Sequence, residues 1–140
     1  MLKVGVLGAG HLGKIHLRLL NQSEKYELVG FYDAFEENAN KVAAEFGYKK
    51  FDSIADLIAA VDVVDIVTPT MQHFDCAKQV IEAEKHIFIE KPISNTVAEA
   101  DEIIALANKY NVKGQVGHVE RFNPAFTAVK DKINNPMFIE

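Results

Sequence analysis

Lys91 stands between Glu90 and Pro92, directly after the apolar run His86–Ile89. A proline restricts the residue before it to an extended backbone, and its peptide bond can be cis, so the Lys91 side chain is aimed with little freedom. A lysine ammonium held in a partly desolvated site can exchange a proton with a substrate hydroxyl. We therefore predict that Lys91 is catalytic, although such a lysine taken alone is more often an exposed residue beside a turn.

A glycine loop lies between the apolar run Val4–Leu7 and a helical pattern. The spacing Gly8-x-Gly10-x-x-Gly13 suits a diphosphate, because the first glycine makes the turn, the second lets the ligand approach the backbone and the third lets helix pack on strand. The free N–H groups of the helix then face the phosphates. The bare pattern is also compatible with a close-packed turn. The loop residues predicted to bind the cofactor are Gly8, Ala9, Gly10, His11, Leu12 and Gly13.

Asp33 lies 20 residues after Gly13, at the end of the run Tyr26–Tyr32. An acidic residue at about this distance accepts hydrogen bonds from the adenosine ribose hydroxyls of a dinucleotide. A carboxylate there repels a ribose phosphate, and neither Ala34 nor Phe35 supplies a cation to bind one. The sequence therefore predicts NAD in preference to NADP. The same aspartate could also cap the helix that follows.

The elements that must position these residues alternate along the chain. Six apolar or β-branched runs are separated by helical patterns. This alternation predicts an α/β fold of the Rossmann type, in which a doubly wound parallel sheet carries helices on both faces. The runs predicted as strands are Val4–Leu7, Tyr26–Tyr32, Tyr48–Phe51, Val63–Val67, His86–Ile89 and Val112–Val119.

Ligands of such a sheet lie outside the carboxyl ends of the strands, near the point where the strand order reverses. His73 could instead pack against the loop that holds the cofactor, and Arg121 could pair with Glu120. His16 and His86 are interpreted as structural, and no spacing of ligand-type residues indicates a metal site. Further residues predicted to border the cofactor at this edge are Thr68, Pro69, Thr70, His73, Glu90, Lys91 and Arg121.

The composition of the 140-residue chain is that of an ordinary compact domain. Its formal net charge of -5 disfavours DNA or RNA as a partner. No apolar run approaches membrane-spanning length and nothing before the first strand resembles a leader, so we expect a cytoplasmic protein without a membrane partner. Cys76 is the single cysteine, which excludes an internal disulfide, and we interpret it as a small apolar residue on a buried helix face.

Four elements together resemble the N-terminal half of the glucose-fructose oxidoreductase/inositol dehydrogenase/rhizopine catabolism (Gfo/Idh/MocA) family. They are Gly8-x-Gly10-x-x-Gly13, Thr68-Pro69-Thr70 with His73, Glu90-Lys91-Pro92 and Arg121-Phe122-Asn123-Pro124. The resemblance implies hydride transfer between NAD(P) and a hydroxyl or carbonyl of a sugar, cyclitol or nucleotide sugar. It also implies that Lys91 lies near the nicotinamide and that the Lys91–Pro92 peptide is cis.

Members of this family carry a second α/β domain, which supplies most substrate contacts and usually the oligomer interface. We therefore divide the chain into a dinucleotide-binding domain, residues 1–120, and the start of a truncated C-terminal substrate and oligomerisation domain, residues 121–140. The second part is predicted to hold a helix over Ala125–Ile133 and the beginning of a strand at Met137–Ile139. The resemblance implies that a sugar-like substrate and a homo-oligomer both depend on the missing domain, so we expect the chain alone to be inactive.

Two other functions remain compatible with parts of the sequence. A stand-alone NAD-binding sensor or partner module, without catalysis of its own, would share the glycine loop and Asp33. A methyltransferase that binds S-adenosylmethionine would share them too, but it gives Lys91 no role.

Overall fold

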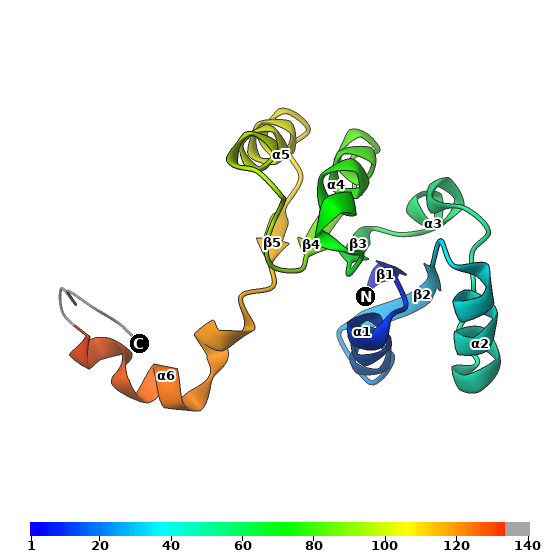
Figure 1. Ribbon diagram of the computed structural model, residues 1–140, viewed down its shortest axis with the longest axis horizontal. Helices are drawn as coiled ribbons and strands as arrows, with labels where there is room; N and C mark the ends of the chain where they lie inside the picture. Colours follow the sequence, from blue (N-terminus) through cyan, green and yellow to red (C-terminus); the bar gives the residue numbers. More distant parts are fainter. Residues whose placement is uncertain (134–140) are drawn as a thin grey trace.

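The computed structural model describes residues 1–133. Its strands form one parallel sheet with the order β2-β1-β3-β4-β5, so the strand order reverses between β1 and β3 (Figure 1). This is the doubly wound Rossmann arrangement that the alternation of strands and helices predicts. The strands are β1 (Leu2–Leu7), β2 (Tyr26–Tyr32), β3 (Val63–Ile66), β4 (His86–Ile89) and β5 (Gly114–Val116).

Helices cover the two faces of the sheet unequally (Figure 1). On one face, α1 (His11–Asn21) and α2 (Glu36–Phe46) lie against the β1 and β2 side. The other face carries α3 (Ile54–Ala60), α4 (His73–Glu82) and α5 (Val97–Lys109). Local sequence signals mark the ends of these helices: a left-handed glycine follows α2, a serine caps α3 and a Thr-x-x-Glu capping box opens α5.

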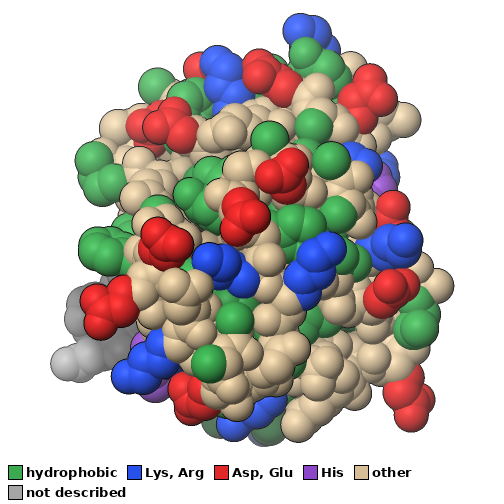
Figure 2. Space-filling view, turned by 90° about the vertical axis from the view of Figure 1, so that its right-hand side faces the viewer, with side chains coloured by type: hydrophobic (Ala, Val, Ile, Leu, Met, Phe, Trp, Pro, Cys, Tyr) green, Lys and Arg blue, Asp and Glu red, His purple; other side chains and the backbone are tan. Residues whose placement is uncertain are grey.

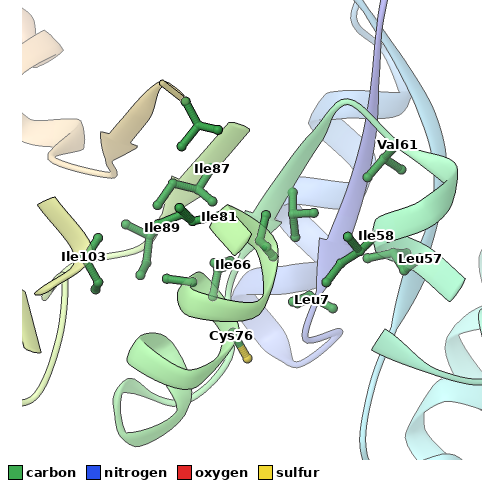
Figure 3. Close-up of a cluster of buried hydrophobic side chains, with 14 of the residues drawn as sticks. Leu7, Leu57, Ile58, Val61, Ile66, Cys76, Ile81, Ile87, Ile89 and Ile103 are labelled. Atoms are coloured by element: carbon green, nitrogen blue, oxygen red, sulfur yellow. The ribbon is translucent and has the colours of Figure 1, made fainter. Parts of the chain in front are cut away.

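Each face of the sheet has its own apolar core. The larger core joins strand residues such as Leu7, Ile66 and Ile89 to α3, α4 and α5, and Cys76 belongs to it (Figure 3). A smaller core beneath α1 and α2 includes Leu17. Burying one large aliphatic side chain stabilises the fold by about 1.5–3 kcal/mol, so the two cores hold the strand ends in fixed positions.

One predicted strand, Tyr48–Phe51, is wrong. It contacts β2 through a single isolated bridge between Phe31 and Lys50. Two backbone hydrogen bonds make this bridge, from Phe31 N–H to Lys49 O (2.9 Å) and from Phe51 N–H to Phe31 O (2.8 Å). Because the glycine stop of α2 and the serine cap of α3 lie so close together, the chain turns away before a second bridge forms. The described sheet therefore has five strands rather than six.

The chain leaves the sheet after β5 (Figure 1). Short turns follow in η2 (Val119–Phe122), α6 (Pro124–Val129) and η3 (Lys130–Lys132), so the predicted helix Ala125–Ile133 is regular only as far as Val129. The predicted strand at Met137–Ile139 lies outside the described residues.

The face that α2 and α3 present mixes basic and acidic side chains without one large patch of a single sign (Figure 2). Among residues 1–133, no helix combines the length and the apolarity that crossing a membrane requires.

Candidate functional site

A cleft of about 810 Å³ opens at the carboxyl ends of β1, β2 and β3, where the strand order reverses. The glycine loop, the end of β2 and the turn after β3 form its walls. The predicted site residues that line this cleft are Gly8, Gly10, His11, Leu12, Gly13, Asp33, Thr68 and Pro69. The sheet therefore brings together residues that are up to 61 positions apart in the sequence, from Gly8 to Pro69.

The three glycines of the loop have different surroundings. Gly8 has a φ of +94°, which side chains rarely adopt, and a Cβ there would lie 2.8 Å from the Val67 carbonyl oxygen. A Cβ on Gly13 would overlap the carbonyl oxygen of Gly8, so this glycine lets α1 pack against the strand. A Cβ on Gly10 would meet nothing within 4 Å. Gly8 and Gly13 are therefore needed for the fold, whereas the space at Gly10 is left open on the cleft side.

Gly10 is the N-cap residue of α1, and no side chain caps this helix end within the described part of the chain. The first N–H groups of a helix have no partner inside the helix and carry the positive end of its dipole. An anion that occupies the space beside Gly10 would therefore meet unpaired donors. This local geometry fits the diphosphate of a dinucleotide.

Asp33 ties the glycine loop to the loop after β2. Its Oδ2 accepts hydrogen bonds from the Ala9 N–H (2.8 Å) and from Asn38 Nδ2 (3.0 Å), while Oδ1 accepts from the Phe35 N–H (2.8 Å). The N-cap residue of α2 is Phe35, so the interpretation of Asp33 as the helix cap is wrong. An ionised carboxylate has about four acceptor sites, so Asp33 can still accept a hydrogen bond from a ribose hydroxyl. The Ala9 N–H, by contrast, is already paired.

His73 joins two loops of the site instead of lining the cleft. Its side chain is buried, with 1% exposure, and Nε2 lies 2.8 Å from the Thr68 carbonyl oxygen while Nδ1 lies 2.8 Å from the Pro92 carbonyl oxygen. A neutral imidazole donates to one of these oxygens and an imidazolium donates to both. His73 thus fixes the turn after β3 against the turn after β4, which is the packing alternative that the sequence left open.

Lys91 lies at the end of β4, beside a second hollow of about 320 Å³. Its peptide bond to Pro92 is cis, as the sequence suggested. The hollow is also lined by Arg121, whose side chain makes no ion pair with any acid among residues 1–133. Lys91 and Arg121 are thereby brought together, next to the chain that leads out of β5.

Sequence reasoning missed several residues of the site. Asn38 bonds both to Asp33 and to the Ala9 carbonyl oxygen (3.1 Å), and the signal that could have found it is its place one turn into the helix after Asp33. Gln72 and Gln79 line the cleft from the α4 side. Cys76 also reaches this wall, and burial raises the pKa of its thiol above the usual range.

His16 is more than a structural residue of α1. Its ring contacts two acids, Asp65 of β3 and Glu90 after β4. Thr70 and Glu90, both predicted to border the cofactor, line neither of the two hollows described above. Within residues 1–133, no three His, Cys, Asp or Glu side chains are grouped as a metal ion would require.

Comparison with known proteins places this geometry in a wider group. A family profile described as "Oxidoreductase family, NAD-binding Rossmann fold" (Gfo/Idh/MocA) matches residues 2–118. A UDP-N-acetylglucosamine 3-dehydrogenase of Acidithiobacillus ferrooxidans is 36% identical over 99% of this chain and 44% of its own length. An inositol 2-dehydrogenase of Rhizobium meliloti is 33% identical over 95% of this chain and 41% of its own length.

Solved structures agree with the sequence relatives. The structure of the Acidithiobacillus dehydrogenase superposes with a TM-score of 0.87 at 37% identity, over 94% of this chain and 43% of that one. GenD2 from gentamicin A biosynthesis, solved in complex with NAD, gives a TM-score of 0.87 at 26% identity, over 94% of this chain and 38% of that one. The chain therefore spans about two fifths of the length of the relatives it matches, 44% and 41% in the two cases above.

Proposed function

The chain belongs to the oxidoreductase family with an NAD-binding Rossmann fold, and on this premise we propose that it is the cofactor-binding portion of a dehydrogenase. The reaction would transfer a hydride between NAD(P) and a hydroxyl or carbonyl carbon of a sugar, cyclitol or nucleotide sugar. The observation that carries the proposal is the cleft itself, in which an uncapped helix N-terminus, an open space at Gly10 and the Asp33 carboxylate face one ligand-sized volume. The sensor-module alternative is not favoured, because the relatives named above are dehydrogenases.

Each part of a bound dinucleotide is proposed to contact a different part of the cleft. The amides at the start of α1 would hold the diphosphate, and Asp33 would accept hydrogen bonds from the adenosine ribose. A phosphate on that ribose would face the Asp33 carboxylate, and exposed Ala34 and Phe35 beside it carry no positive charge. NAD is therefore proposed in preference to NADP.

Lys91 is proposed as the residue that moves the proton. The bound nicotinamide supplies or accepts the hydride, which leaves the proton of the substrate hydroxyl to be transferred separately. Lys91 is exposed to its hollow, and its backbone N–H is held by Glu90 at 3.0 Å, so its ammonium can reach a hydroxyl while its backbone stays in place. Arg121 lines the same hollow and would bind an acidic group of the substrate or cofactor.

The path of the chain supports a division into two parts. Residues 1–120 are proposed as the dinucleotide-binding domain and residues 121–140 as the start of a second domain, because the chain leaves the sheet after β5 (Figure 1). A sugar-like substrate and a homo-oligomer are proposed to depend on that second domain.

Calorimetric titration of NADH and NADPH into the chain tests the proposal. NADH should bind, and it should bind more tightly than NADPH. The matched variant is Gly10→Ala, whose methyl group meets no protein atom but fills the space proposed for the diphosphate. An overpacked methyl group costs about 1–3 kcal/mol, or roughly a 5- to 150-fold loss of affinity, while the thermal midpoint should stay unchanged. Absence of NADH binding to the folded wild-type chain, or equal binding by Gly10→Ala, would overturn the assignment.

A further inference from the structure

Three titratable side chains from separate elements meet on the sheet face that carries α1. His16 of α1 places Nδ1 2.8 Å from Asp65 Oδ2 on β3 and Nε2 3.5 Å from Glu90 Oε1 at the end of β4. The side chains of His16, Asp65 and Glu90 are 16%, 5% and 11% exposed. The three side chains line neither of the two hollows of the proposed site, and the proposed mechanism uses only the contact of Glu90 with the Lys91 amide.

Asp65 makes His16 the anchor of this cluster. Its Oδ1 is buried and has no hydrogen-bond partner among the described residues, so His16 is the group that compensates the buried carboxylate. The hydrogen bond to Asp65 raises the pKa of His16 above 6.5, against the opposing effect of burial, and the nearby Glu90 adds to the rise. Both acids therefore favour a ring that carries a proton on each nitrogen.

Glu90 also contacts the backbone of Lys91, in the turn after β4 that is called the Lys91 turn below. Its Oε2 accepts a hydrogen bond from the Lys91 N–H at 3.0 Å. Its Oε1, which faces His16, lies 2.6 Å from the position that a Cβ on Gly117 would occupy, so the glycine leaves room for the carboxylate. A continuous series of contacts thus runs from α1, the helix that begins at the glycine loop, to the backbone of Lys91.

We propose that His16 is a positioning residue for the Lys91 turn. Its Nδ1–H is donated to Asp65, and in the protonated ring the charge lies close to Glu90, whose Oε1 is 3.5 Å from Nε2 and whose Oε2 holds the Lys91 amide. When Nε2 loses its proton, the ring loses its positive charge and a lone pair lies near the Glu90 carboxylate, so the attraction between the two groups is lost. The ionisation of His16 therefore controls how firmly the turn that presents Lys91 is held. The importance of this turn for hydride transfer rests on the proposed function.

The surroundings of His16 identify which groups can drive this change. Asp65 and Glu90 are the titratable groups in contact with its ring, and Phe88 of β4 packs on it edge-to-face with centroids 6.0 Å apart. His16 and Asp65 also line a third hollow, of about 650 Å³. Its other titratable residues, which make no hydrogen bond or ion pair with His16 in the described part of the chain, are Tyr26, His86 and Lys113.

An NMR titration of the isotope-labelled chain, without nucleotide, tests the proposal. The Lys91 amide should shift with pH at the same midpoint as the His16 ring. This pH-dependent change in the Lys91 amide shift, called the Lys91 phase below, should disappear in His16→Gln. In Glu90→Gln the phase of the Lys91 amide should also disappear, while the His16 ring still titrates against Asp65. The control is His86→Gln, because His86 lies at the start of β4 and Glu90 follows the end of that strand, and this variant should leave the Lys91 phase intact.

A Lys91 amide that stays flat through the His16 midpoint overturns the proposal, and so does a phase that persists in His16→Gln. If His16→Gln does not fold, the wild-type titration and Glu90→Gln still decide the outcome. NADH affinity is measured separately, so failure of NADH binding with an intact Lys91 phase would refute the proposed function and leave the coupling standing. Normal NADH binding with a flat Lys91 amide would refute the coupling alone.

Discussion

The buried hydrogen bonds of His73 give a stability prediction whose size follows from the structure. Replacing His73 by leucine introduces an apolar side chain of similar bulk and removes both ring nitrogens. The ring donates a hydrogen bond to at least one of the carbonyl oxygens of Thr68 and Pro92, each 2.8 Å from a ring nitrogen in a site that is 1% exposed, so leucine would leave at least one buried acceptor without its donor. An unsatisfied buried acceptor costs about 1–3 kcal/mol, so the substitution should lower the free energy of unfolding by at least about 1–3 kcal/mol.

This loss is a large part of the 5–15 kcal/mol that stabilises a typical domain. With a urea dependence of about 2 kcal/mol per molar, the unfolding midpoint of His73→Leu should fall by at least about 0.5–1.5 M. Urea unfolding followed by circular dichroism measures the change. The control is His118→Leu, because the His118 side chain is exposed and makes no hydrogen bond within residues 1–133, so it should change stability by about 0.5 kcal/mol at most. An unchanged midpoint in His73→Leu would refute the view that this ring holds the two loops together.

Three more predictions follow from single contacts. Gly13→Ala should lower the unfolding free energy by about 1–3 kcal/mol in a urea melt, since its methyl group would overlap the Gly8 carbonyl oxygen, and a wild-type midpoint would contradict that packing. The hydrogen bond to Asp65 raises the pKa of His16 above 6.5, so the stabilising contribution of His16 is complete below about pH 6.5 and is lost as the pH rises through the folded-state pKa. Urea midpoints between about pH 6 and pH 9 should therefore fall more in the wild type than in His16→Gln, and parallel curves would contradict this contribution. In a full-length enzyme, Lys91→Ala should depress the rate of hydride transfer far more than NADH affinity, whereas equal losses in both would indicate a binding role.

The parts of the site that the sequence predicts are those determined by local chain geometry. The glycine spacing fixes a strand, a turn and a helix start within ten residues, and the periodic runs then place Asp33 and Lys91 at strand ends of one sheet. Such signals lie within a few residues of the group they position, so no knowledge of distant contacts is required.

The contacts that the sequence does not predict are non-local. His16 meets Asp65 and Glu90, which lie 49 and 74 positions away, and no local pattern marks their convergence. His73 shows the same limit, because its two acceptors are backbone oxygens that any residue type could supply. The strand expected at Tyr48–Phe51 failed for a related reason: composition favours a strand there, but the spacing between two helices leaves no length for pairing.

A crystal structure of the chain with NADH bound tests the central claim most directly. The account predicts the diphosphate over the amides of His11–Gly13, the adenosine ribose against the Asp33 carboxylate and the nicotinamide beside Lys91. A dinucleotide bound away from the glycine loop would contradict the cofactor site. A nicotinamide that lies far from Lys91, with the diphosphate in place, would contradict the catalytic assignment alone.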